Sequence, residues 1–208
     1  MSVARKTKEE TEKTYHALLE AAAELFRIQG YSRTTLNEIA KKAGMTRGAF
    51  YWHFEKKSDV IRAIWENHAY ASFNPIREAI AKLPLENPAG AYRNHVREMI
   101  DVISDNQSVA RAMFIILHNM EVSEKNNDLI EFLGEQHIRF HGSMSEAFIR
   151  IHAAGQLKPG ISAEQAASGC SCLLLGMINR ALLPFGDFNL KWDGQEIFKS
   201  HLDGILRE

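Results

Sequence analysis

The sequence is poor in the features that mark several common protein classes. It has only two cysteines in 208 residues, and it contains no uncharged apolar run of about 18 residues, the length that crosses a membrane. Its first eight residues, Met-Ser-Val-Ala-Arg-Lys-Thr-Lys, lack the apolar stretch of a secretory signal. These absences disfavour a disulfide-stapled secreted protein and a membrane protein. We therefore expect a cytoplasmic chain with no membrane partner.

The two cysteines are close neighbours in the sequence. Cys170 and Cys172 would point to different sides of a helix, so a disulfide between them is not expected. We expect both to be small buried thiols in a reducing compartment, in preference to a metal or redox site.

Excess charge of one sign is also absent. The formal net charge is −1, which does not by itself indicate nucleic-acid binding. The charges are unevenly spread, however: residues 1–60 carry +3 and the rest of the chain carries −4. A locally basic end on an acidic body suits a protein that touches phosphate with one end only, although such asymmetries are often no more than solvated faces.

No segment shows the alternation of a half-buried strand, and helical periodicity dominates. The apolar stripe from Tyr15 to Phe26 predicts a first helix over residues 8–29, which Gly30 ends as a left-handed cap. A second helix begins at Thr35, because Thr35 and Glu38 have the spacing of a capping box, and Gly44 closes it. A third short helix covers residues 46–53. The sequence thus predicts an all-α fold, with a small three-helix head on a larger helical body.

Six further helical regions are predicted after the head. The first runs from about Ser58 and must kink or stop at Asn74–Pro75, resuming to about Leu83. Asn87 and Pro88 are placed as N-cap and first residue of the next helix, to about residue 104. Later helices cover about 106–121, 127–154, 162–183 and 193–206, and Ser162 with Gln165 forms a second capping box. The coarse division is a head of residues 1–56 and a body of residues 57–208.

The two short helices joined by Gly44-Met45 match a helix-turn-helix at residues 35–54, in which the second helix enters the major groove of DNA. Phe50 and Phe54 lie four residues apart, on a face that can pack inward. Arg47 and Tyr51 share the outer side, flanked by Gly48 and Trp52. The Arg47 guanidinium can donate two hydrogen bonds to guanine, and Gly48 allows a close approach of the backbone.

Other side chains of this segment are suited to phosphate. Tyr51, His53 and Thr35 can bond phosphate oxygens, and Lys57 can add a charge. The alternative is that Tyr51 and Trp52 pack on the body of their own chain. The predicted DNA-binding residues are Thr34, Thr35, Thr46, Arg47, Gly48, Tyr51, Trp52, His53 and Lys57.

The segment Thr-Thr-Leu-Asn-Glu-Ile-Ala-Lys-Lys-Ala-Gly-Met-Thr-Arg-Gly-Ala-Phe-Tyr-Trp-His-Phe-Glu-Lys-Lys-Ser, residues 34–58, resembles the signature of the tetracycline-repressor (TetR) family almost position by position. Its Tyr-Trp-His-Phe string resembles the branch that contains AcrR-type repressors of multidrug efflux pumps. Looser similarities lie at residues 111–122 and 155–157, in the helix from Ser162, and at residues 182–184 and 187–190. One departure is Met-Glu-Val-Ser at 120–123, where that branch usually has Lys-Cys-Glu-Phe.

The resemblance implies a ligand-responsive transcriptional repressor that binds a palindromic operator as a homodimer and is released by a small hydrophobic effector. Residues 1–56 would be the DNA-binding domain, and residues 57–208 would bind effector and dimerise through helices 162–183 and 193–206. The nearly all-apolar run 170–183 agrees with burial on several sides, although a core helix of a monomer would show the same. An activator, or a regulator of a metabolic operon such as one for fatty acids, remains open.

An apolar cavity with a few polar anchors is the general form of an effector site. The predicted effector-binding residues are Trp65, Phe73, Met99, Ile103, Phe114, Leu117, His118, Phe140 and Met177, although stripes at helical spacing also form ordinary cores. Asn119 and Glu121 are further polar candidates. The sequence shows no phosphate loop, nucleophile elbow or zinc-protease helix, so we expect no catalytic residue, cofactor or metal. His137 and His141 have no third ligand at a fixed spacing.

Overall fold

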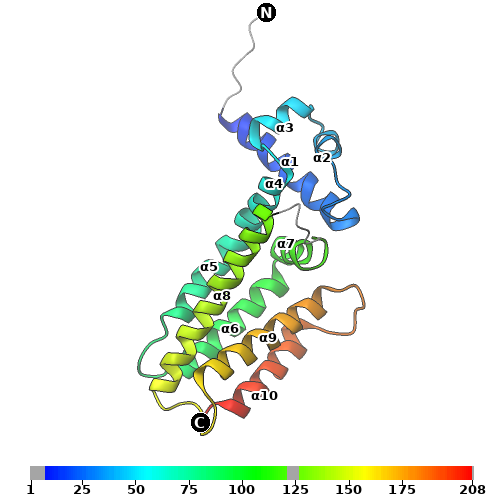
Figure 1. Ribbon diagram of the computed structural model, residues 1–208. Helices are drawn as coiled ribbons and strands as arrows, with labels where there is room; N and C mark the ends of the chain where they lie inside the picture. The colour runs from blue at the N-terminus through cyan, green and yellow to red at the C-terminus, as the bar shows by residue number, and fades with distance from the viewer. Residues whose placement is uncertain (1–7, 121–126, 208) are drawn as a thin grey trace, which may run out of the picture. The chain divides into compact units, whose positions relative to one another are not determined.

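The computed structural model describes residues 8–120 and 127–207. Figure 1 follows these residues from the blue helix α1 to the red helix α10. Their helices are α1 (Lys8–Gln29), α2 (Leu36–Lys42), α3 (Arg47–His53), α4 (Lys57–Ile64), η1 (Trp65–Tyr70), α5 (Ala71–Ala81), α6 (Pro88–Asp105), α7 (Gln107–His118), α8 (Asn127–Ala153), α9 (Ala163–Leu182), η3 (Leu190–Gly194) and α10 (Gln195–Ile205). The prediction of an all-α fold is confirmed, and none of the described helices is long and apolar enough to cross a membrane.

The chain divides into two compact units, which we call the head unit and the body unit. The head unit contains the described residues up to Ala69 together with those of Arg111–Leu129, and the body unit contains Tyr70–Ala110 and the chain from Ile130 onward. The head unit therefore includes most of α7, which lies far from α1 in the sequence. The predicted functional boundary at residue 56 stays a prediction, because compactness alone does not assign a function.

The head unit is built around a buried face of α1. Leu18, Ala22 and Phe26 are fully buried on this face. The expected capping box is present at the start of α2: the Thr35 hydroxyl accepts from the Glu38 N–H at 3.2 Å, and the Glu38 carboxylate accepts from the Thr35 N–H at 2.8 Å. Because both orphan amides of this helix end are paired, α2 begins at a defined residue.

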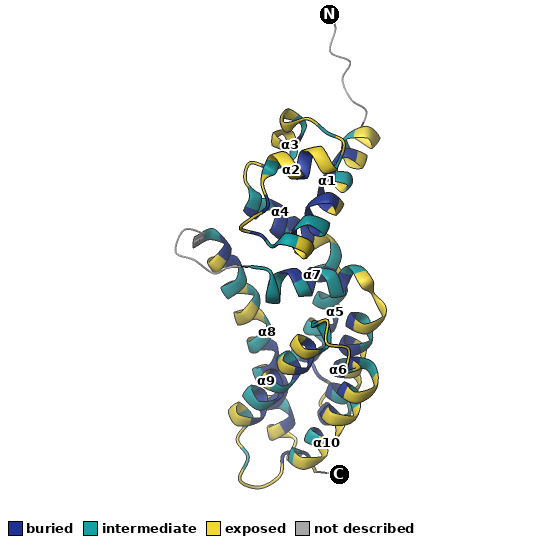
Figure 2. Ribbon diagram, turned by 90° about the vertical axis from the view of Figure 1, so that its right-hand side faces the viewer, coloured by how far each residue is buried: buried dark blue, intermediate teal, exposed yellow. Residues whose placement is uncertain are grey.

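The body unit starts its longer helices with the caps that the sequence predicts. The Asn87 side chain accepts from the Gly90 N–H at 3.0 Å, with Pro88 in the first turn of α6. Glycine at position 90 has a steric explanation, since a Cβ there would lie 2.4 Å from the Asn87 amide nitrogen. Ser162 and Gln165 cap α9 reciprocally. Figure 2 shows the buried residues of such helices in dark blue beside their yellow exposed faces.

The predicted stop of the helix at Asn74–Pro75 is wrong, and the alternative of a kink there stays a prediction. Pro75 lies inside α5, which continues to Ala81. The regular α-helical bonding is interrupted earlier, at the π-helical turn η1 from Trp65 to Tyr70. Pro75 cannot donate to the carbonyl four residues before it, and its ring crowds that carbonyl. The irregular turn directly before α5 is where the backbone departs from ideal geometry.

The two thiols differ in their surroundings. Both are free, as expected, and Cys170 is buried, which raises the pKa of its thiol to about 12. The expectation of a second buried thiol is wrong, because Cys172 is exposed. It lies on the outer face of α9 with Gly176 and Asn179, which are also exposed. The apolar run therefore does not bury every side of this helix within its own chain.

Candidate nucleic-acid interface

The inner face of α3 is fixed to the rest of the head unit. Phe50 is fully buried and Phe54 is 4% exposed. The Phe54 ring stacks on Tyr15 of α1 with centroids 5.3 Å apart. The Thr46 hydroxyl caps the helix by accepting from the Ala49 N–H at 3.2 Å. These contacts confirm the expected inner face and hold the opposite face of α3 outward.

The outer face of α3 presents Arg47, Tyr51 and Trp52 to solvent, and Trp52 is 80% exposed. An Arg47 guanidinium nitrogen donates to the Tyr51 hydroxyl at 3.1 Å, and the guanidinium lies 5.4 Å from the centre of the Tyr51 ring. The arginine is therefore oriented by its own helix while its remaining donors stay available. Exposure of the indole leaves apolar surface in water, which is unfavourable. An indole beside a guanidinium is suited to contact with base edges and the sugar–phosphate backbone.

The two threonines before α2 already use their hydroxyl groups. Thr34 is 1% exposed, and its hydroxyl donates to the Gly30 carbonyl at 2.7 Å. The Thr35 hydroxyl donates to the Glu38 carboxylate at 2.8 Å, and these bonds from Thr35 lower the pKa of Glu38. His53 is half-buried, with its ring 5.9 Å from Tyr15. The DNA contacts predicted for these residues and for Gly48 stay predictions.

Lys57, the first residue of α4, is half-buried and reaches the turn between α1 and α2. Its ammonium donates to the carbonyls of Tyr31 at 2.6 Å and Thr34 at 2.9 Å. It also lies 4.2 Å from the centre of the Tyr31 ring. Desolvation by burial lowers the pKa of Lys57. The sequence motif predicts a cation at this position but does not show that it bonds these carbonyls. The phosphate contact predicted for Lys57 stays a prediction.

The end of α7 is attached to α1 within the head unit. The Asn119 side-chain amide donates to the carbonyls of Phe26 and Arg27, both at 2.8 Å. The Asn119 carbonyl accepts from the Tyr31 N–H at 2.9 Å. Further back along α7, Arg111 pairs with Glu20 at 2.6 Å. The amide predicted as an effector anchor is thus engaged with the C-terminal end of α1.

A second attachment joins the start of α8 to the start of α4. The Asp128 carboxylate accepts from the Ser58 hydroxyl at 2.7 Å and pairs with the Lys56 ammonium at 2.5 Å. The hydrogen bonds from Lys56 and Ser58 lower the pKa of Asp128. Arg62 donates to the Asp128 backbone carbonyl at 2.5 Å. Both ends of the α7–α8 connection are therefore bonded to helices of the head.

Some of the predicted effector residues belong to the head unit. Phe114, Leu117 and His118 on α7 and Trp65 of η1 are half-buried. The rings of Phe114 and His118 lie 5.1 Å apart. Nε2 of His118 is buried and has no hydrogen-bond partner among the described residues. A buried polar atom without a partner is costly, which makes this atom a candidate to bond a ligand.

The other predicted effector residues belong to the body unit. Met99, Ile103 and Met177 are buried, and Phe73 and Phe140 are half-buried. Ile103 lines a hollow of about 380 Å³ with Ala181 and Leu182 from the end of α9. The predicted anchor Glu121 lies outside the described residues.

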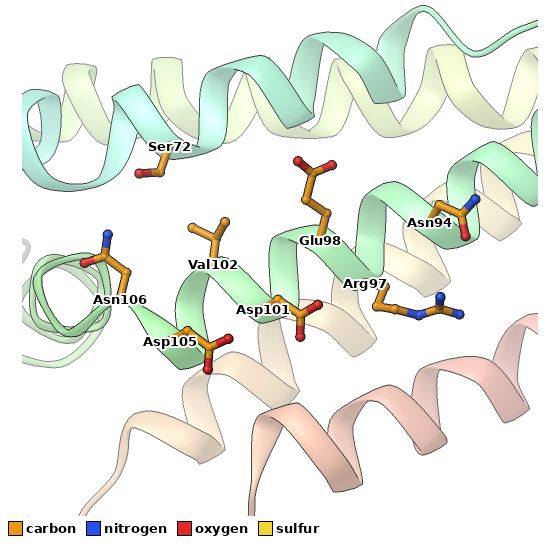
Figure 3. A pocket seen from close by; sticks show the side chains of 8 residues that line it. All are labelled: Ser72, Asn94, Arg97, Glu98, Asp101, Val102, Asp105 and Asn106. Atoms are coloured by element: carbon orange, nitrogen blue, oxygen red, sulfur yellow. The ribbon is translucent and has the colours of Figure 1, made fainter.

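A larger hollow of about 610 Å³ lies on the outer side of α6. Figure 3 shows Ser72 projecting toward it from α5, and the remaining lining residues on α6 or directly after it. None of the predicted effector residues lines it. Two of its three acids are already paired, since Asp101 accepts from Gln195 at 2.9 Å and Asp105 pairs with Lys191 at 2.5 Å. This polar surface does not resemble a site for an apolar ligand.

The capped α2 and α3, with an anchored inner face and an exposed Arg-Tyr-Trp face, define a helix-turn-helix DNA-binding regulator. Residues 18–64 match the family model of the bacterial regulatory proteins of the tetR family. This match confirms the likeness to the TetR family that residues 34–58 predict.

Relatives match over nearly the whole chain. The transcriptional regulator TtgR of Pseudomonas putida is 28% identical over 199 residues, which is 96% of this chain and 94% of that one. The structure of NalD, the secondary repressor of the MexAB-OprM multidrug efflux pump in Pseudomonas aeruginosa, superimposes with a TM-score of 0.84 at 27% identity and covers 97% of this chain and 100% of that one. A complex of SmeT from Stenotrophomonas maltophilia with triclosan superimposes with a TM-score of 0.76 at 27% identity, covering 94% and 92%. The predicted likeness to efflux-pump repressors is confirmed.

Proposed function

We propose that this chain is a homodimeric repressor that binds a palindromic operator, is released by a small hydrophobic effector and controls a multidrug efflux pump. The exposed face of Arg47, Tyr51 and Trp52 on the anchored helix α3 carries the proposal. Arg47 reads base edges, and Tyr51, Trp52 and His53 contact the sugar–phosphate backbone. The relatives named above support the efflux assignment, and no catalytic step is part of the proposal.

The DNA function is tested by enriching random-sequence duplexes on the full chain. The expected product is a two-fold site with half-sites about one helical turn apart, or slightly more if the DNA is overwound. Mapping the bound sites in the genome and measuring transcription with and without the gene identify the target. Efflux genes that rise on deletion support the proposal. A fall in their transcription on deletion would indicate an activator. Binding beside fatty-acid genes would indicate a metabolic regulator.

We propose that the dimer forms through α9 and α10. On α9, the side opposite the buried face is a stripe of small residues that includes Cys172, Gly176 and Asn179, all exposed. On α10, Ile197 is 44% exposed. Small residues allow two helices to approach closely, and an exposed isoleucine gains from being covered. Leu174 and Met177, in contrast, face the core of their own chain.

Two glycines provide a matched test of this interface. Gly176 on α9 and Gly142 on α8 are both exposed, and a Cβ at either would have open space. Gly176→Glu is expected to yield monomers by light scattering at micromolar concentration, whereas Gly142→Glu stays dimeric. A dimeric Gly176→Glu, or a monomeric wild type, would contradict the interface.

We propose that the effector bonds to Nε2 of His118 and packs on neighbouring apolar groups of its unit, Trp65, Phe114 and Leu117. The buried and unpartnered Nε2 supports this assignment. The effector contacts predicted for Phe73, Met99, Ile103, Phe140 and Met177, which belong to the body unit, stay predictions. A small molecule with one hydroxyl on an apolar framework would suit such surroundings.

Triclosan, an apolar compound with one phenolic hydroxyl, is a concrete probe for this site. Calorimetric titration is expected to show binding to the wild type and to His137→Ala, an exposed control, and weaker binding to His118→Ala. If triclosan releases the selected duplex, that duplex must weaken triclosan binding by the same factor. Equal affinities with and without DNA would refute the release mechanism for this ligand.

A further inference from the structure

We propose that Lys57 is a positioning residue, whose ammonium fixes the turn that starts α2 and does not bind a DNA phosphate. The inference rests on the proposed DNA-binding function, and it concerns how the helix-turn-helix is held in a binding conformation. It departs from the simplest interpretation of a lysine beside this motif, which is a phosphate contact.

The geometry around the Lys57 ammonium is that of a filled site. A lysine ammonium has three N–H donors. Three carbonyls of one turn surround it, from Tyr31 at 2.6 Å, Thr34 at 2.9 Å and Ser32 at 3.4 Å. The Tyr31 ring lies 4.2 Å away and adds a cation–π contact. The donors are therefore matched by acceptors of the protein itself.

The turn that Lys57 holds determines where α2 begins. The Thr34 N–H donates to the Tyr31 carbonyl at 3.2 Å, so the turn is closed on itself. The next residue, Thr35, is the N-cap of α2. Carbonyls that converge on one point repel each other unless a cation lies between them. Lys57 thus ties the first turn of α4 to the start of α2, and α2 supports the recognition helix α3.

Leaving this turn for a phosphate would be unfavourable for Lys57. Its departure would leave three converging carbonyls without their donor. Lys57 is half-buried, and desolvation by burial lowers the pKa of its ammonium. Lys56, one residue earlier, is 57% exposed and pairs with Asp128. Lys56 therefore serves as a control residue, because it carries the same charge as Lys57 without the contacts to the carbonyls of the turn.

The salt dependence of DNA binding separates positioning from phosphate contact. Each phosphate contact contributes about 0.9 to the slope of log affinity against log salt. Lys57→Met is expected to weaken binding of the enriched duplex about tenfold at every salt concentration, because charge-assisted hydrogen bonds are lost. Its slope should match that of the wild type, and Lys56→Met shows what the removal of a neighbouring charge does to the slope. A slope smaller in magnitude than that of the wild type by about 0.9 would overturn the inference.

Lys57→Arg provides a second comparison. The arginine keeps the charge, but its planar fork does not fit three carbonyls that surround a compact ammonium. This variant is expected to bind as weakly as Lys57→Met. Wild-type affinity in Lys57→Arg would instead indicate that only the charge matters, as in a phosphate contact, and would overturn the proposal.

A measurement on the wild-type chain avoids any dependence on folded variants. In an ammonium-selective ¹⁵N spectrum, Lys57 is expected to give a signal protected from solvent exchange that stays in place when duplex is added. Loss of protection in the free chain, or coupling to DNA phosphorus, would refute the inference. A wild type that enriches no duplex would instead refute the proposed function, so the two failures are distinguishable.

Discussion

The attachment of α7 to α1 predicts a measurable effect of Asn119→Ala. The substitution removes both 2.8 Å hydrogen bonds to the Phe26 and Arg27 carbonyls while leaving the backbone contact to Tyr31. Each such bond contributes about 0.5–1.5 kcal/mol net. Arg27 is exposed, so water can replace one donor, and the expected loss is about 1–1.5 kcal/mol. For a chain of this size that lowers the melting temperature by about 2–6 °C.

The isosteric Asn119→Asp variant sharpens this test. Its carboxylate has no donor for the two carbonyls and adds negative charge at the C-terminal end of α1, where the helix dipole is also negative. The expected loss of stability is therefore at least as large as for alanine. Hydrogen exchange in the last turn of α1 should accelerate in both variants, more than exchange in α6. Wild-type stability and exchange in Asn119→Asp would refute the proposed attachment.

Four further predictions concern the head and the thiols. Arg47→Ala should cost about 1–3 kcal/mol on the enriched duplex and relax preference at one base position, and unchanged preferences would contradict the role in base reading. Thr46→Ala should lower stability by about 1 kcal/mol through loss of the α3 cap, whereas Thr46→Ser should not, as denaturant titration would show. In the monomeric Gly176→Glu variant at pH 8, only one thiol should react with a maleimide, because burial raises the pKa of Cys170 to about 12, and adding Cys172→Ser should leave none. Because the pKa of Asp128 is lowered in the folded chain, its carboxylate stabilises the fold above the ordinary aspartate pKa, and this stability is lost as pH falls through the lower pKa of the folded state. Asp128→Asn should therefore make the free energy of unfolding fall less steeply at acid pH. Parallel curves of stability against pH for the variant and the wild type would contradict this.

Features that depend on neighbouring residues were predictable from the sequence. The capping boxes at Thr35 and Ser162 and the Asn87 cap involve side chains and amides three residues apart. Gly30 and Gly44 have φ values of 82° and 70°, which glycine adopts most easily. The inner and outer faces of α3 follow from its periodicity. Local chemistry is therefore sufficient for most helix boundaries and for the recognition surface.

Features that depend on distant residues were not predictable. Lys57 bonds carbonyls 23 and 26 residues away, and Asn119 bonds carbonyls 92 and 93 residues away. Backbone carbonyls carry no sequence signature, so nothing in the motif distinguishes a lysine that binds them from one that binds phosphate. Likewise, helical periodicity identifies apolar residues such as Met99 and Met177 without separating a core from a ligand cavity.

The close approach of Gly90 to Asn87 has a consequence for the divergence of related chains. A methyl group at position 90 would lie 2.4 Å from the Asn87 amide nitrogen, so alanine, although the better helix former, would displace the Asn87 side chain from its cap. A shorter cap such as serine would remove the clash and admit alanine. Positions 87 and 90 should therefore covary among descendants of this gene: asparagine with glycine, or serine with a larger residue. Asn87→Ser alone keeps a good N-cap and is an accessible first step, whereas a larger residue at position 90 alone meets the Asn87 side chain.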